Sequence, residues 1–168
     1  MLKKVLVVMG SDSDFPVMAA CINMLVDFGI EHDVRICSAH RSPDLASQMA
    51  RSAAKDGYGV IIAAAGLAAH LPGIIAAYTI LPVIGVPIMS GALAGQDALY
   101  AIVQMPAGIP VAAVAIDGAA NAAILAIQIL AVHDEYLQLQ LLRYKQKLVD
   151  SVNDRQQRLD EQLATGKA

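Results

Sequence analysis

The hydrophobic residues of this chain fall into short continuous runs separated by polar loops and amphipathic segments. Five segments predict the strands of a parallel sheet, and they cover residues 3–9, 32–37, 58–65, 82–88 and 109–116. The first contains a continuous apolar run, which is typical of a strand covered on both faces. The segments between these strands have helical spacing. The first of these predicts a helix with Asp14 as its N-cap and Gly29 at its end, and the second a helix that begins with Ser42 and Pro43.

Strands that alternate with helices predict a parallel sheet with helices on both faces. We expect an α/β fold, a flavodoxin-like three-layer sandwich with a five-stranded or slightly larger parallel sheet. Ligands of such folds bind beyond the carboxyl ends of the strands, here between strands one and three with strand two beside one. The loops at residues 10–14, 38–43 and 64–73 follow these three strands and carry most of the functional-looking side chains.

The last two segments differ from this alternation. Residues 118–132 are apolar all round, which predicts a buried helix. Residues 134–164 carry a narrow apolar stripe, typical of an amphipathic helix. We therefore expect a flavodoxin-like catalytic core at 1–133, and an amphipathic helix and tail at 134–168 that packs on neighbouring subunits.

Composition favours a protein that associates with copies of itself. The chain is 57% hydrophobic and 16% charged, more apolar surface than a lone monomer easily hides. Residues 1–133 hold six basic and nine acidic side chains, so they lack the basic stripe of a nucleic-acid-binding protein. The most apolar stretch, 58–95, is interrupted by glycine, histidine and proline, so we expect no membrane partner and a cytoplasmic location.

The spacing of the cysteines and of the other possible metal ligands predicts no metal site. Cys21 and Cys37 have the spacing of neither a disulfide framework nor a metal site, and we interpret them as reduced core thiols. No cluster of His, Cys, Asp or Glu has metal-ligand spacing.

The first loop, Gly-Ser-Asp-Ser-Asp, combines small residues with a helix N-terminus, which attracts an anion such as phosphate. Ser11 and Ser13 can donate to phosphate oxygens. Asp12 and Asp14 cannot both face a phosphate, so one of them caps the helix or binds a sugar hydroxyl. A Gly-Ser-Asp sequence is also common in turns that bind no ligand, so this motif alone is weak evidence for a phosphate site.

The second loop places Arg41 beside His40. A guanidinium binds phosphate through two hydrogen bonds, although Arg41 could equally pair with Asp44 at the surface. An imidazole carries protons in both directions near neutral pH, which makes His40 a candidate general acid/base; it could also serve only to hold the loop.

The third loop is almost wholly apolar and includes His70. This histidine could be a second proton carrier, a substrate contact or a structural residue at a helix start. The small side chains allow a flat ligand to approach the backbone while water is excluded. A phosphate clamp, one proton carrier and a dry wall suit a reaction with a water-sensitive or diffusible intermediate.

These loops closely resemble a known enzyme family. Six motifs occur in order: MGSDSD, SAHRSP, AAHLPG, PVIGVPI, LYAIVQMP and GIPVA. They are similar to those of the class I N5-carboxyaminoimidazole ribonucleotide (N5-CAIR) mutases, the PurE family of purine biosynthesis. The related class II enzymes, which carboxylate 5-aminoimidazole ribonucleotide (AIR), share SAHR but differ at the third loop.

The resemblance implies an isomerase that moves a carboxylate from the exocyclic nitrogen of N5-CAIR to ring carbon C4, giving CAIR. It implies a homo-octamer without cofactor or metal. By motif, His40 is the general acid/base, and the other implied site residues are Ser11, Ser13 and Arg41 for the 5′-phosphate, Asp14 for the ribose, Ser38 and Ala39 beside them, and Gly66, Leu67 and His70 around the base and carboxylate.

Two alternatives remain open from the sequence. One is an AIR carboxylase that uses free CO2, with the same fold and histidine. The other is a non-catalytic module that binds a phosphoribosyl ligand. The chain also departs from the family pattern, since Ala64 and Leu67 stand in a loop that usually holds more glycine.

Overall fold

The structure is a computed structural model that describes residues 3–165. The chain divides after Leu130 into two compact units. The first contains the sheet and five α-helices, and the second is dominated by one long helix. Among residues 3–165, no helix is both long and apolar enough to cross a membrane.

The sheet has five parallel strands in the order β2-β1-β3-β4-β5. The strands are β1 (Lys4–Met9), β2 (His32–Ile36), β3 (Tyr58–Gly66), β4 (Val83–Ile88) and β5 (Ala112–Ala113). Strand two lies beside strand one, and the winding changes direction between strands one and three. The α/β doubly wound fold predicted from the sequence is thereby confirmed.

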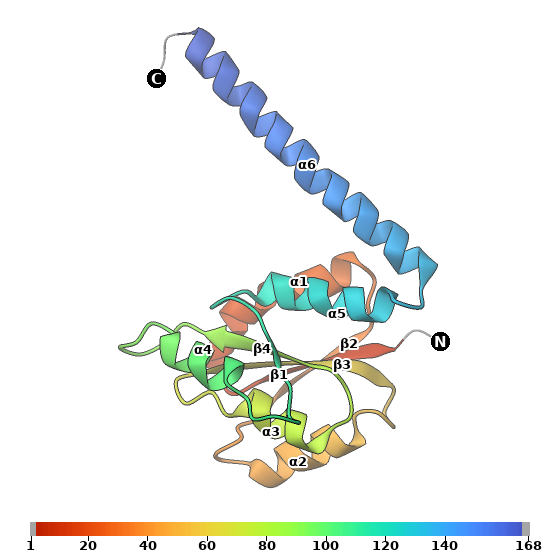
Figure 1. Ribbon diagram of the computed structural model, residues 1–168, viewed down its shortest axis with the longest axis vertical. Coiled ribbons are helices and arrows are strands. Elements are labelled where there is room, and N and C mark those ends of the chain that lie inside the picture. The colour runs from red at the N-terminus through yellow and green to blue at the C-terminus, as the bar shows by residue number, and fades with distance from the viewer. Residues whose placement is uncertain (1–2, 166–168) are drawn as a thin grey trace. The chain divides into compact units, whose positions relative to one another are not determined.

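Helices cover both faces of the sheet, which makes three layers (Figure 1). They are α1 (Phe15–Asp27), α2 (Pro43–Ser52), α3 (Leu71–Tyr78), α4 (Gln96–Val103) and α5 (Ala119–Ala131). Alternate residues of the strands, such as Leu6 and Ile61, form one core with α2, α3 and α4. Figure 1 shows α1 and α5 on the opposite face, so both sides of β1 and β3 are buried, as their continuous apolar sequences require.

Strand five is much shorter than the predicted run at 109–116. Only Ala112 and Ala113 pair with β4, at one edge of the sheet. Pro110 has no N–H to donate, and the chain turns away through Asp117, whose φ is +56°. The hydrophobic run marks a partly covered edge segment rather than a full strand.

Helix α5 is also less buried than its apolar sequence predicted. Its alanines at 119, 122, 123 and 126 are fully buried, whereas Asn121 and Gln128 are exposed. One face, made of these alanines with Ile127 and Ala131, therefore packs closely on the core, and the other residues of the helix are half-buried or exposed in the single chain.

The second unit contains α6 (Glu135–Ala164), a 30-residue helix. The carboxylate of Asp134 accepts a hydrogen bond from the backbone N–H of Leu137 at 2.9 Å and so caps the helix start. Farther along, Leu148, Val152 and Leu159 are exposed, so in the single chain this part of the predicted apolar stripe has no cover.

Candidate active site

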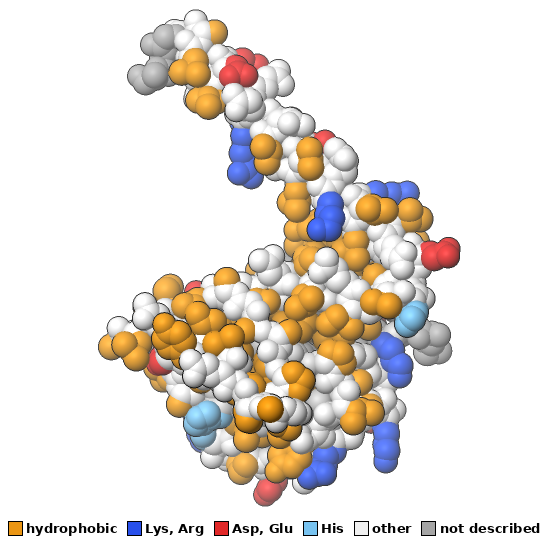
Figure 2. All heavy atoms as spheres, in the orientation of Figure 1, with side chains coloured by type: hydrophobic (Ala, Val, Ile, Leu, Met, Phe, Trp, Pro, Cys, Tyr) orange, Lys and Arg blue, Asp and Glu red, His pale blue; other side chains and the backbone are white. Residues whose placement is uncertain are grey.

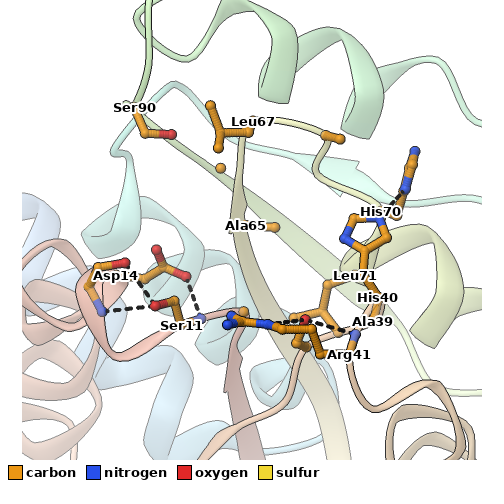
Figure 3. Close-up of a pocket in the computed structure, with 15 residues that line it drawn as sticks. Ser11, Asp14, Ala39, His40, Arg41, Ala65, Leu67, His70, Leu71 and Ser90 are labelled. Atoms are coloured by element: carbon orange, nitrogen blue, oxygen red, sulfur yellow. Dashed lines mark hydrogen bonds between the residues drawn. The ribbon is translucent and has the colours of Figure 1, made fainter.

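A pocket of about 570 Å³ lies beyond the carboxyl ends of β1, β2 and β3 (Figure 3). Met9 is in register with both Ile36 and Ala64, so these strands end at the same edge and their loops converge. Every candidate site residue of the sequence lines this pocket: Ser11, Ser13, Asp14, Ser38, Ala39, His40, Arg41, Gly66, Leu67 and His70.

The first loop is held by a capping box that involves Ser11 and Asp14. The backbone N–H of Ser11 donates to the Asp14 carboxylate at 3.1 Å, and the Ser11 hydroxyl accepts from the backbone N–H of Ser13 at 3.3 Å. Asp14 occupies the N-cap position of α1, but its side chain points back to Ser11 and does not cap that helix. This loop is fixed before any ligand binds.

Asp14 is the one buried polar residue of the described chain. Burial raises the pKa of its carboxyl above the ordinary value, while hydrogen bonds from Ser11 and Gly10 act in the opposite direction. A carboxylate in this position has a strong tendency to accept hydrogen bonds, and a ribose hydroxyl is a donor that could supply one.

The two serine hydroxyls of the loop are paired and exposed. Ser13 Oγ donates to Ser11 Oγ at 2.9 Å, and Ser11 Oγ donates to the Asp12 carboxylate at 3.1 Å. Asp12 does not line the pocket. An incoming phosphate would replace Asp12 as the acceptor, which is a modest rearrangement for side chains that already face solvent.

Ser38 organises the second loop. Its carbonyl accepts from both the N–H and the hydroxyl of Ser42, at 2.8 and 2.9 Å. Its hydroxyl accepts from the backbone N–H and the Nε of Arg41, at 3.3 and 3.4 Å. Ser42 stands at the start of α2 as predicted, yet its hydroxyl is used for this turn and not as a cap.

Arg41 has no ion pair with any carboxylate of residues 3–165, so the surface pairing with Asp44 is absent. It is the one lysine or arginine among the residues that line the pocket. Its guanidinium is exposed and has donors left over after the contact with Ser38. The pocket therefore offers one fixed positive charge to an anion.

His40 and His70 meet inside the pocket (Figure 3). His40 Nε2 lies 2.6 Å from His70 Nδ1, and the two rings stand at 72° to one another. His70 sits at the N-cap position of α3, but its side chain makes no capping hydrogen bond. The sequence did not predict this pairing, because the two residues lie on different loops.

The third wall of the pocket is apolar. It includes Ala65 and Gly66 at the end of the buried strand β3, and Leu67 and Ala68, which follow that strand. Leu67 adopts a φ of +54°, a conformation that favours glycine, and its side chain is 53% exposed. A Cβ added to Gly91 would lie 2.6 Å from Leu67 Cδ2, so the leucine packs over that glycine.

Ser90 is a pocket residue that sequence reasoning missed, together with Gly10, Ala65, Ala68 and Leu71. It follows β4 by two positions, and β4 pairs with β3 up to Gly66 and Ile88. The rule that parallel strands end at one edge applies also to the loop after strand four, although that loop holds few functional-looking side chains.

Neither of the two thiols lines this pocket. Cys21 and Cys37 are free and buried, as expected for core thiols. Burial raises the pKa of the Cys21 thiol to about 12, so it stays protonated at neutral pH. Within residues 3–165, no group of three or more His, Cys, Asp or Glu side chains could hold a metal ion.

Comparison with known proteins places this pocket in a family. The AIR carboxylase family profile matches residues 4–151. The N5-carboxyaminoimidazole ribonucleotide mutase of Pyrococcus horikoshii is 52% identical over 155 residues, which are 92% of this chain and 88% of that protein. The mutase of Thermotoga maritima is 47% identical over 160 residues, 95% of this chain and 94% of that one.

A solved structure agrees with the sequence matches. The crystal structure of Treponema denticola PurE superimposes with a TM-score of 0.83 at 29% identity, covering 92% of this chain and 97% of that one. The order of the strands, the position of the pocket and the sequence matches lead to one assignment. The chain belongs to the AIR carboxylase, or PurE, family.

Proposed function

We propose that this chain is an N5-CAIR mutase of purine biosynthesis, an isomerase that converts N5-CAIR to CAIR. The observation that carries the proposal is the position of His40, which shares one pocket with the serines of the first loop and with Arg41. Relatives of about 50% identity, matched over most of their length, have this activity in their names. The steps below assign the reaction to the residues of the pocket.

The 5′-phosphate of the ribotide binds between the first two loops. Ser11 and Ser13 donate their hydroxyl hydrogens to its oxygens, and Arg41 supplies the positive charge. Asp14 accepts from a ribose hydroxyl, with Ser38 and Ala39 lining the pocket beside it. These contacts hold the phosphoribosyl end of the substrate, so its aminoimidazole ring extends toward His40, His70 and the apolar wall.

His40 moves a proton in each half of the reaction. When the carboxylate leaves the exocyclic nitrogen as CO2, the nitrogen gains a proton from His40. After C4 attacks the CO2, C4 carries both a hydrogen and the new carboxylate, and His40 removes that hydrogen as a proton. The two transfers cancel, so the enzyme ends as it began. Help of this kind contributes about 10²–10⁴-fold.

The apolar wall keeps CO2 next to the ring. Gly66 and Leu67 contribute no polar side-chain atom to it, so water gains little by entering there. The remaining acceleration comes from holding two reactants in contact. No step in this scheme requires a metal or an organic cofactor.

The close alternative is an AIR carboxylase that takes free CO2, and the description of the matched family gives it support. One experiment separates the two. Purified protein is given N5-CAIR, or AIR with bicarbonate, and CAIR formation is followed by its absorbance. A mutase forms CAIR efficiently from N5-CAIR alone, whereas a carboxylase prefers AIR with bicarbonate. Binding of both ribotides without any turnover would favour the non-catalytic module.

We further propose a cytoplasmic homo-octamer, with residues 1–133 as the catalytic core and 134–168 as the part that contacts neighbouring subunits. Apolar side chains are spread over the face of the core seen in Figure 2. Ile80 is 93% exposed and Tyr100 59% exposed in the single chain. Surfaces of this kind are typical of subunit contacts.

A further inference from the structure

Ser90 carries the most conspicuous polar atom of the pocket that the proposed mechanism leaves unused. Its Oγ is buried and makes no hydrogen bond to any part of residues 3–165. Burying a hydroxyl without a partner costs free energy, so such groups in native proteins call for an explanation. Ser90 also lines the pocket, so a rotation of its short side chain would turn the hydroxyl from its buried position toward a ligand.

The fold holds this hydroxyl in place. Ser90 follows β4, and Gly66 ends the neighbouring strand β3. A Cβ added to Gly66 would lie 2.5 Å from Ser90 Oγ and 3.3 Å from the carbonyl oxygen of Ile88. A residue other than glycine at position 66 would therefore displace the hydroxyl, so the space that Gly66 leaves is the space that Ser90 Oγ uses.

Ser90 is the polar exception on its side of the pocket. Residues 65–68 line that side and have no polar side-chain atom. Figure 3 shows the Ser90 hydroxyl turned toward the segment that carries Leu67. A ligand group that reaches this wall meets one hydrogen-bond donor in otherwise apolar surroundings.

We propose that the Ser90 hydroxyl donates a hydrogen bond to the carboxylate that is transferred. This inference rests on the proposed function. The phosphate and the ribose have hydrogen-bonding partners in the first two loops, and the proton transfers have His40, whereas the steps proposed above place the carboxylate only against the apolar wall of Gly66 and Leu67. A carboxylate only accepts hydrogen bonds, and a hydroxyl without a protein partner is free to donate. Bonds to a charged acceptor are the stronger kind, especially away from water.

The assignment is tested by the binding of two ribotides that differ in the carboxylate alone. CAIR and AIR are each titrated by calorimetry into the unaltered protein and into Ser90→Ala. We expect the variant to bind CAIR at least about tenfold more weakly and AIR about as well as before. Ser47→Ala, which removes an exposed hydroxyl of α2 bonded to the carbonyl of Asp44, should change neither affinity.

Thermal unfolding of Ser90→Ala provides the folding control, and its midpoint should be no lower than that of the unaltered protein, since an unpartnered hydroxyl is removed. Unchanged CAIR affinity, or equal weakening of CAIR and AIR, would overturn the role of Ser90 while leaving the proposed function standing. If the unaltered protein binds neither ribotide, the proposed function fails, and the Ser90 assignment fails with it.

Discussion

His40 Nε2 and His70 Nδ1 lie 2.6 Å apart, with ring centroids separated by 4.8 Å. At that distance one nitrogen donates and the other accepts, so a single proton lies between the two rings. The contact fixes the orientation of the His40 ring and leaves its other nitrogen, Nδ1, to face a ligand. His70 is therefore a positioning residue for the proton carrier in our account.

Substitution of His70 tests whether its hydrogen bond positions the His40 ring for catalysis or only supports the fold. His70→Phe keeps a flat ring but removes the hydrogen bond, so we expect kcat to fall by up to about 10²-fold with KM little changed. His70→Asn places an amide near the former Nδ1 and should recover much of the loss. Steady-state kinetics with N5-CAIR measure both variants, and equal activity of the two would argue against the hydrogen bond.

Arg41→Ala tests the phosphate clamp. The guanidinium makes no ion pair within residues 3–165, so its removal should leave the folded state intact. We expect KM for N5-CAIR to rise at least about tenfold, because a charge-assisted contact is lost, while kcat changes much less. Arg41→Lys keeps the charge without the two-pronged geometry and should lie between. A KM that stays the same in Arg41→Ala would exclude the clamp.

Much of this architecture could be predicted because a parallel α/β sheet requires apolar strands that alternate with helices, and this alternation is visible in the sequence. Residues 5–9 and 60–65 have no polar side chain, since β1 and β3 are covered on both faces. Loops after adjacent strands then had to converge, which brought Ser11, His40 and His70 into one pocket. The last strand was overestimated, because hydrophobicity alone does not tell an edge segment from a paired one.

Side-chain directions could not be predicted. Asp14 stands where an N-cap was expected, yet its carboxylate bonds Ser11 behind it. His70 was considered as a helix-start residue, and its ring bonds His40 instead. Ser90 was missed because a lone serine after a strand has no signature until the backbone shows that Gly66 makes room for it. These details depend on contacts between loops that lie far apart in the sequence.

Tyr58 predicts an alkaline limit of stability. It is buried and donates to the Asp33 carboxylate; burial, and then this hydrogen bond, raise the pKa of its phenol from 10.0 to about 12. The contribution to stability is full below pH 10 and is lost as the pH rises toward 12. Tyr58→Phe should be less stable by about 1 kcal/mol at pH 8, with the difference shrinking above pH 10. Urea unfolding at several pH values measures this, and a constant difference up to pH 12 would contradict it.

The exposed stripe of α6 predicts an effect on assembly. Leu148 and Val152 are 50% and 60% exposed in the single chain, so changing both to Glu should leave the secondary structure intact. If the stripe contacts neighbouring subunits, a buried charge there weakens association, and light scattering should report a smaller particle. Asn153→Glu combined with Gln157→Glu adds the same two charges at exposed polar positions of α6 and serves as the control. An unchanged mass in the double variant would exclude these two residues from the interface.

The most direct measurement compares turnover and binding in His40→Asn. His40 is exposed, so the variant should fold like the unaltered protein. We predict that it binds CAIR with nearly unchanged affinity but converts N5-CAIR to CAIR about 10²–10⁴-fold more slowly, since the phosphate grip remains and the proton carrier is gone. A variant that keeps full turnover would contradict the account, because the proposed mechanism assigns both proton transfers to His40 alone.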